Sequence, residues 1–289
     1  MTLLVDNSIL KSVATCSTQA LLRYHYGWDQ DTPRDELQLG TAAHAALASY
    51  LLDGDVNAAA KLFEDLAPAG TPDTRTSISN TTRIMGRWLT THPLEKLPFK
   101  ALTVEQPFRV PLCGGIDFIG VWDGIGEDNS GRPWLIEHKT TGWLKDDWWT
   151  QYEMDSQLSG YIWAARQLGH DVMGAYLNGI EFSKLPSYPR QCQTHSTLYS
   201  ACGILHANFA IRPIVRTTEM LETWHRTAVI LAHQWMWMVA KHEEGQQEGQ
   251  FTGACRWCQF QPYCRMGRPA GFLQANYTVN HWRPLERGR

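Results

Sequence analysis

Apolar residues recur at helical spacing along much of the first ninety residues and again in the last third of the chain. Helices are expected over about residues 8–26, 37–53, 78–91, 146–169 and 217–244. Boundary residues support this assignment, because Asp6 can cap the first helix, Gly54 follows the second and Pro93 follows the third. The last of these helices is apolar on most of its circumference, so we expect it to be largely buried.

The middle of the chain has the composition of strands. Residues 101–110, 114–125 and 134–140 are rich in β-branched and aromatic side chains, and the polar run 127–133 is typical of a turn. These segments predict a three-strand antiparallel meander, and residues 173–183 predict one further strand. The chain is therefore expected to form a single α/β domain over residues 1–289, with a small central mixed sheet flanked by helices.

Composition excludes several functional classes. The chain has 289 residues, of which 43% are hydrophobic, and 29 acidic against 26 basic side chains give a net charge of -3. Binding to nucleic acid would therefore need a local groove, since the chain as a whole is not basic. No apolar run approaches the ~20 residues that span a bilayer, and the N-terminus lacks the pattern of a secretion signal. We expect a cytoplasmic protein with reduced cysteines and no membrane association.

The strand 134–140 ends with an acid and a base on one face. Glu137 and Lys139 are two residues apart, so their side chains point the same way, about 7 Å apart, while His138 points to the other face. Such a pair is common on strands and is usually a solvated salt bridge. Here an apolar run leads into the acid, and Asp117 and Asp123 share its parity on the preceding strand.

The turn between these two strands can bring Asp117 or Asp123 beside Glu137. Two buried carboxylates repel each other and raise each other's pKa unless a cation lies between them. A hard divalent cation such as Mg²⁺ or Mn²⁺ takes oxygen ligands of this kind. Lys139 could then orient a metal-bound water or stabilise negative charge on a phosphate. The pattern therefore predicts a divalent-metal site.

Three of the seven cysteines lie close together near the C-terminus. Cys255, Cys258 and Cys264 follow the spacing C-x₂-C-x₅-C, in which two thiolates of a C-x-x-C turn reach one metal centre without strain. A fourth ligand is expected from Cys16, and for zinc His242 or His281 could also serve. The spacing alone is compatible with zinc and with an iron–sulfur cluster.

The acidic strands resemble the core of the PD-(D/E)XK nuclease superfamily, and specifically its RecB-like branch. The matching segments are GGID (residues 114–117) and LIEHKTT (residues 135–141), separated by a turn. The branch also has an upstream Gly-x-x-x-His, matched by Gly40 to His44, and a downstream Gln-x-x-x-Tyr, matched by Gln157 to Tyr161. The order and placement of these motifs are more specific than any one of them.

The resemblance extends over about residues 8–265, although residues 45–100 and 180–250 match by helical character only. The Pro-Asp for which the superfamily is named is missing, as is common in this branch. Glu105, on the first strand of the meander, is expected to have a structural or surface role.

The resemblance implies a role for each matched residue. Asp117 and Glu137 would be carboxylate ligands of the metal, with Asp117 preferred to Asp123 because Gly-x-Ile-Asp is the usual frame. The main-chain carbonyl of His138 and the imidazole of His44 would be further ligands. Lys139 would position the nucleophilic water, and Gln157 and Tyr161 would contact the nucleic-acid backbone.

The resemblance also implies the occupant of the cysteine site. A subset of RecB-like nucleases, including the AddB nuclease domain and CRISPR-adaptation nucleases, holds a [4Fe–4S] cluster through one N-terminal and three C-terminal cysteines. The corresponding ligands would be Cys16, Cys255, Cys258 and Cys264. Such a cluster would join the first helix to the C-terminal segment, so its role would be structural.

The implied function is that of a DNA exonuclease that depends on Mg²⁺ or Mn²⁺ and prefers single-stranded DNA or DNA ends. It would serve recombination, repair, CRISPR adaptation or phage DNA processing, alone or with partner proteins of those pathways. Two alternatives stay open: a catalytically silent subunit that binds DNA ends, and a zinc-stabilised enzyme of unrelated chemistry. The intact Asp117, Glu137 and Lys139 argue against the silent subunit.

Overall fold

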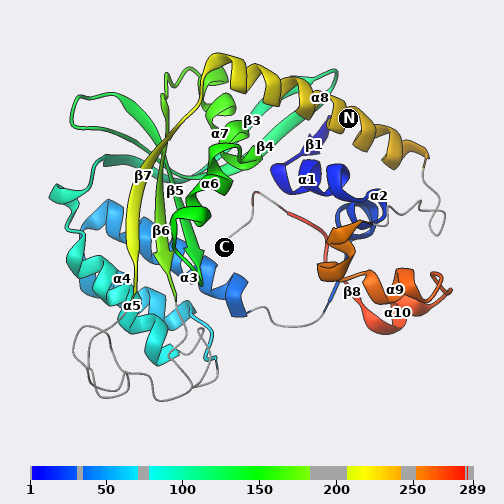
Figure 1. Cartoon of the computed structure of the whole chain (residues 1–289), viewed down its shortest axis with the longest axis horizontal. Coiled ribbons are helices and arrows are strands. Elements are labelled where there is room, and N and C mark those ends of the chain that lie inside the picture. Colours follow the sequence, from blue (N-terminus) through cyan, green and yellow to red (C-terminus); the bar gives the residue numbers. More distant parts are fainter. Residues whose placement is uncertain are drawn as a thin grey trace.

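A six-stranded mixed sheet forms the centre of the molecule (Figure 1). The computed structural model describes residues 2–30, 35–70, 78–182, 207–241, 252–283 and 285. The strands β1-β4-β5-β6-β7 span Leu3–Val5, Ile116–Glu127, Pro133–Thr141, Gly174–Glu181 and Phe209–Val215, and β3 (Lys100–Cys113) pairs with β4. The expected meander is confirmed, because β3, β4 and β5 pair in antiparallel order. The sheet is mixed, because β1 is parallel to β4 and β6 is parallel to β5.

Helices cover both faces of this sheet. On one face, α3 (Asp35–Asp53), α4 (Val56–Leu66) and α5 (Ile78–Thr91) share a buried core with side chains of β5 and β6. On the other, α1 (Asn7–Thr15), α7 (Ser156–Gln167) and α8 (Thr218–Lys241) share a second core with β3 and β4. The sheet therefore separates two hydrophobic cores, as expected for an α/β domain.

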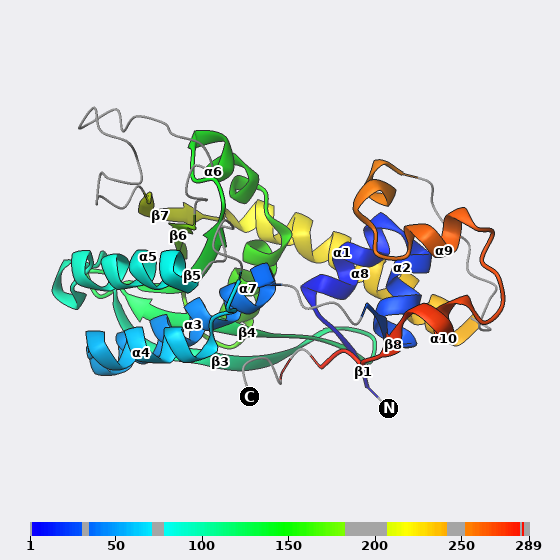
Figure 2. The ribbon, with the colours of Figure 1, turned by 90° about the horizontal axis from the view of Figure 1, so that it is seen from below.

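Segments from both ends of the chain form a small module beside the sheet, which we call the terminal module (Figures 1 and 2). Its N-terminal part is α2 (Ser17–Ala20), a π-helical turn (Leu21–His25) and β2 (Trp28–Asp29). Its C-terminal part is a 3-10 turn (Gly253–Trp257), α9 (Gln261–Arg265), α10 (Phe272–Asn276) and β8 (Thr278–Val279), which pairs with β2. Among the residues that the structure describes, its buried core is six residues, so it has little hydrophobic stabilisation of its own.

The expected N-terminal helix is interrupted where the sequence reaches Cys16. This residue has an extended backbone (φ -164°, ψ 117°), so α1 ends at Thr15 and α2 begins at Ser17. The helix expected over 146–169 is also divided, into α6 (Asp146–Glu153) and α7, because Asp155 caps α7 by accepting a hydrogen bond from the backbone N–H of Leu158. The helix α4 and the strands β1 and β7 were not expected from the sequence.

The expectation that the long helix α8 is buried on most sides is wrong. Leu221, Trp224 and Trp235 are buried, but Ile230 is 67% and Trp237 64% exposed. The helix packs through one stripe against the core that contains α1 and α7, and its other face meets solvent. No helix in the described part of the chain combines the length and apolar character that a bilayer span requires.

Asp128 closes the turn that joins β4 to β5. Its carboxylate accepts hydrogen bonds from the backbone N–H groups of Ser130 (2.8 Å) and Arg132 (3.1 Å), and from Nε1 of Trp134 (3.2 Å). Burial alone would raise the pKa of Asp128, but these donors and the Arg132 guanidinium lower it to about 2. The pKa is thus below that of the unfolded chain, about 3.9. The carboxylate therefore stabilises the fold above about pH 4, and this stabilisation is lost as the pH falls towards 2.

We expect Asp128→Asn to lower the melting temperature by several degrees near neutral pH, because the amide presents only one acceptor oxygen to these donors. The difference in melting temperature between this variant and the wild type should decrease as the pH is lowered from about 5 to about 3, because the stabilisation by the Asp128 carboxylate is then lost in the wild type. Thermal denaturation followed by circular dichroism would measure both. Asp146→Asn, at a fully exposed carboxylate, is the control and should change little. A deficit that does not vary with pH would contradict this account of Asp128.

Candidate functional site

The sheet forks at the point where β4 and β5 separate. β4 pairs with β5 only through Gly124–Glu127 and with β1 through Ile116–Phe118. Among the described residues, no strand therefore lies beside residues 119–123 on that edge. Asp123 and Glu137 are the first residues beyond the last β4–β5 pair, Gly124 with Ile136. The backbone N–H of His138 donates to Oδ2 of Asp123 (2.7 Å), so this carboxylate continues the hydrogen bonding into the fork.

Two further residues approach Asp123 from neighbouring elements. His44 of α3 places Nδ1 3.0 Å from Oδ1 of Asp123. Glu105 of β3 offers an oxygen to the same group, and one potential ligand atom from each of the three lies within 4.8 Å of the others. The backbone of Glu105 has φ 46°, a conformation that costs energy for an L-residue and that often marks a functional site. Glu105 is exposed, in keeping with the expected surface position, but its approach to Asp123 was not expected from the sequence.

The charges of His44 and Asp123 support each other. Burial alone would raise the pKa of Asp123, but the charge and hydrogen bond of His44 hold it well below its usual range. Burial also lowers the pKa of His44, yet the Asp123 carboxylate outweighs this and raises it. Asp123 is therefore an anion at neutral pH, fixed in the fork and available to a cation.

Glu137, Lys139 and Gln157 form a hydrogen-bonded triangle. The Nζ of Lys139 lies 2.5 Å from Oε1 of Glu137 and 3.1 Å from Oε1 of Gln157. The Nε2 of Gln157, on α7, donates to the same Glu137 oxygen (3.0 Å). Glu137 is 2% exposed, so the sequence expectation of a buried acid beside a lysine is met by the geometry.

Burial and mutual repulsion control the protonation of this triangle. Burial and the charge of Asp123 raise the pKa of Glu137 to about 7, against the opposing effect of Lys139. Burial disfavours the ammonium of Lys139, but the carboxylates of Glu137 and Asp123 outweigh it and raise the lysine pKa. The two carboxylates destabilise each other, and a bound cation would relieve that repulsion.

The structure does not bring Asp117 into this group, so the preference for Asp117 over Asp123 requires correction. Asp117 forms an ion pair with Arg109 (2.5 Å) and lies opposite Pro111 in β3 and Leu4 in β1. It is six residues from Asp123 along β4, about 20 Å at the rise of a strand. The turn at Asp128 folds β5 against the end of β4 only, so Asp123 meets Glu137 and Asp117 does not.

His138 directs its imidazole away from the hydrogen-bonded triangle, as the alternation of side chains along a strand predicts. Its Nδ1 lies 3.0 Å from Nδ2 of Asn178, whose Oδ1 accepts a hydrogen bond from Nε1 of Trp88. Burial lowers the pKa of His138 to about 4, which keeps the imidazole neutral. The side chain therefore anchors β5 in the core, and the expected metal contact through its main-chain carbonyl stays a prediction.

Tyr161 is buried one helical turn after Gln157. Its ring packs edge-on against Phe108, with a centroid distance of 5.3 Å. Gly120 permits this contact, because a Cβ at that position would lie 2.6 Å from the Phe108 ring and 3.0 Å from Tyr161. The geometry thus gives Tyr161 a packing role, and its expected contact with a nucleic-acid backbone stays a prediction.

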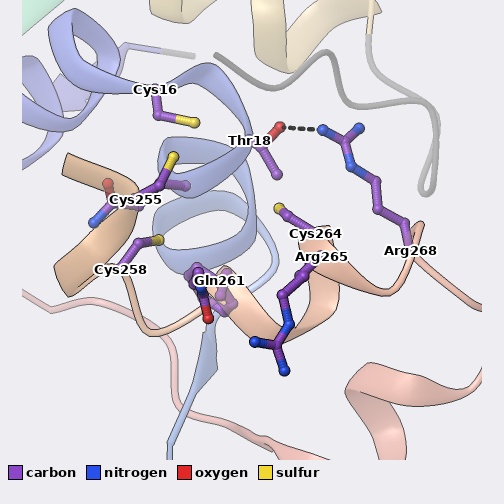
Figure 3. A pocket seen from close by; sticks show the side chains of 10 residues that line it. Cys16, Thr18, Cys255, Cys258, Gln261, Cys264, Arg265 and Arg268 are labelled. Atoms are coloured by element: carbon purple, nitrogen blue, oxygen red, sulfur yellow. Dashed lines mark hydrogen bonds between the residues drawn. The ribbon is translucent and has the colours of Figure 1, made fainter. Parts of the chain in front are cut away.

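The four predicted cysteine ligands line one cavity in the terminal module. Cys16, between α1 and α2, meets Cys255, Cys258 and Cys264 around a space of about 220 Å³ (Figure 3). Burial and the neighbouring thiols raise the pKa of Cys258, and burial likewise raises that of Cys264 against the effect of Arg268. His281 does not line this cavity, and His242 lies outside the described residues.

The spread of the thiols limits what they could hold. In the described part of the chain, only His44, Glu105 and Asp123 bring three potential ligand atoms within 4.8 Å of one another. No three of the cysteine sulfurs therefore lie as close to one another as in a closed zinc site, where tetrahedral Zn–S bonds place the sulfurs about 3.8 Å apart. All four nevertheless face a common space, as a larger group would require (Figure 3).

Comparison with known proteins gives one family. The PD-(D/E)XK nuclease superfamily matches residues 7–265. No curated protein matches the chain. Among solved structures, the chain is similar to the one described as "Crystal structure of SSO0001", at 15% sequence identity and a TM-score of 0.36, over 89% of this chain and 94% of that chain.

The family match extends over most of the chain and includes every element that contributes to the fork. The mixed sheet flanked by helices agrees with the restriction-endonuclease-like core that was expected from the sequence. The two acidic strands, the lysine and the histidine of α3 stand in the order that the resemblance implied. The chain therefore belongs to the PD-(D/E)XK nuclease superfamily.

Proposed function

We propose that this protein is a divalent-metal-dependent DNA exonuclease that hydrolyses phosphodiester bonds, with a preference for single-stranded DNA or DNA ends. The observation that carries the proposal is the convergence of Asp123, Glu137 and Lys139 at the fork between β4 and β5. The superfamily supplies the nuclease activity. The exonucleolytic mode and the substrate preference go beyond the family match and are part of the proposal.

The residues at the fork fit a hard divalent cation. Asp123, Glu137 and Glu105 offer carboxylate oxygens and His44 an imidazole nitrogen, a donor set suited to Mg²⁺ or Mn²⁺. A bound ion would polarise a phosphate oxygen and lower the pKa of a water molecule. We assign the ligand role first given to Asp117 to Asp123, and we add Glu105 to the candidates.

The side chains around the ion would hold the reacting groups. Glu137 and Gln157 fix Lys139, so its ammonium is oriented before substrate arrives. An ammonium in a partly buried site stabilises the negative charge that develops on the phosphate more strongly than it would in water. The Nδ1 of His44 lies 3.0 Å from Oδ1 of Asp123 and holds that carboxylate in the fork.

We further propose that the cysteine cavity holds a [4Fe–4S] cluster. What supports this proposal is that four thiols, at the positions that the resemblance assigns to the cluster ligands, line one cavity. The cluster would connect the N-terminal helices to the C-terminal segment and supply stabilisation that the small core of the terminal module lacks. The whole chain would then act as one nuclease domain.

The cellular role follows from the resemblance alone. RecB-like nucleases act in recombination, repair, CRISPR adaptation or phage DNA processing. We propose that this protein acts in one of these pathways, in the cytoplasm, with or without partner proteins. The hydrogen-bonded Glu137, Lys139 and Gln157 favour an active enzyme over a silent end-binding subunit.

Digestion of end-labelled DNA tests the activity directly. The protein, purified without oxygen, is incubated with Mn²⁺ and either single-stranded or double-stranded DNA, labelled at one end or the other. We expect progressive loss of nucleotides from an end, faster on the single strand, and no loss without metal. Lys139→Ala should abolish it, whereas Lys145→Ala, whose ammonium lies over the ring of Trp143, should not. Intact DNA in every metal-containing reaction would contradict the proposal.

A further inference from the structure

A polar groove lies next to the cysteine cavity in the terminal module. Its volume is about 550 Å³, within the range of ligand sites in proteins. Arg23, Tyr24, Arg256, Trp257 and four glutamines line it, and Gln19, Cys258 and Gln261 line both this groove and the cysteine cavity. No described residue that lines the groove is acidic.

The C-x-x-C turn itself supplies two exposed side chains of this groove. Arg256 and Trp257 are the residues between Cys255 and Cys258, and the N–H of Cys258 donates to the carbonyl oxygen of Cys255 (3.2 Å) to close the turn. Both thiols point into the cysteine cavity (Figure 3), so the two intervening side chains project outward. Trp257 is 82% exposed, with the Arg256 guanidinium 5.0 Å from its ring centroid.

On the opposite wall, the charge of Arg23 is mostly compensated by neighbouring groups. Arg23 pairs with Asp29 (3.0 Å), and its Nη1 donates to the main-chain oxygen of Asn280 (2.9 Å). Its guanidinium also lies 5.9 Å from the Tyr24 ring centroid. Because Asp29 balances Arg23, the positive charge available to a ligand comes chiefly from Arg256.

A cation, an exposed indole and several amides match the chemistry of an unpaired nucleotide. Arginine binds phosphate oxygens, an exposed tryptophan stacks on any base, and glutamines can donate to or accept from base edges. A duplex would not fit as well, because its base faces are covered by stacking. We propose that this groove binds a nucleotide unit of single-stranded DNA, with a base on Trp257 and a phosphate at Arg256. This rests on the proposed function, since it gives the nuclease a second contact with its substrate.

Fluorescence anisotropy of a labelled dT20 oligonucleotide tests the groove without cleavage. The protein is the cluster-loaded Glu137→Gln variant, without added divalent metal. Trp257→Ala should weaken binding by about 10-fold, and Trp257→Phe should restore most of it, because a smaller ring still stacks. Arg256→Ala should reduce the slope of log K against log salt by about 0.7, the value for one phosphate contact on a single strand.

Matched controls lie on α8, outside the groove. Arg226→Ala and Trp237→Ala remove the same exposed side-chain types and should leave both affinity and salt slope unchanged. Iron content and circular dichroism of each variant confirm that the C-x-x-C turn is intact. Normal binding by both Trp257→Ala and Arg256→Ala would overturn the inference.

Two further outcomes separate the possibilities. Competition by dTMP only at millimolar concentration supports a site for a strand, whereas dTMP that binds as tightly as dT20 overturns that assignment. The proposed function is tested separately, by digestion of DNA with the wild-type protein in Mn²⁺. If the wild type cleaves DNA and the groove variants bind dT20 normally, the inference about the groove is refuted and the proposed function stands. If the groove variants bind dT20 more weakly and the wild type cleaves no DNA, the proposed function is refuted and the groove assignment stands.

Discussion

Replacing Asp123 with asparagine is expected to reduce Mn²⁺-dependent DNA cleavage by roughly 10³-fold, because the fork loses an anion that a divalent ion needs. The fold should survive, since an asparagine oxygen can still accept the hydrogen bond from the N–H of His138. Initial rates on end-labelled single-stranded DNA measure the effect, and calorimetric titration with Mn²⁺ should show the matching loss of metal binding.

Asp117→Asn is the matched control for this prediction. Like Asp123→Asn, it removes a carboxylate that lies on β4 and points to the same face of the sheet. The carboxylate of Asp117, however, pairs with the half-exposed Arg109. The ion pair is only partly exposed, but it lies about 20 Å along β4 from the fork, so activity should stay within about twofold of the wild type. Full activity of Asp123→Asn, or loss of activity in Asp117→Asn, would reverse the assignment of the metal ligand.

Replacing Cys258 with alanine is expected to remove the brown colour of the anaerobically purified protein and to lower its melting temperature by about 10 °C or more. A metal site formed only in the folded state contributes its binding free energy to folding. Here it would hold together segments from both ends of the chain around a six-residue core. Iron and sulfide analysis and thermal denaturation provide the two measurements.

Cys113→Ala is the control, because Cys113 is half-buried beside His233, away from the cysteine cavity. It should keep its colour and nearly all of its stability. A Cys258→Ala protein that stays brown and melts like the wild type would refute the cluster. Purified wild-type protein that contains zinc and no iron would refute it as well.

Several features of this protein follow from local sequence pattern. The three strands of the meander, the helix α5 and the pairing of Glu137 with Lys139 on one face are consequences of side-chain alternation and helical period. The C-x-x-C turn is local too, since the short loop holds its two thiols close together. These features depend on residues a few positions apart, so the printed sequence is enough to predict them.

The identity of the acidic partner was decided by the tertiary structure. Asp117 and Asp123 have the same parity, and only the length over which β5 pairs with β4 determines which of them reaches Glu137. Glu105 approaches Asp123 because β3 pairs along almost all of β4, and the positive φ of Glu105 has no signature in the sequence. Likewise, Arg256 and Trp257 become one wall of a groove only because residues of the N-terminal helices form the other. Local pattern determines which way a side chain points, but strand register and the packing of distant segments determine what it meets.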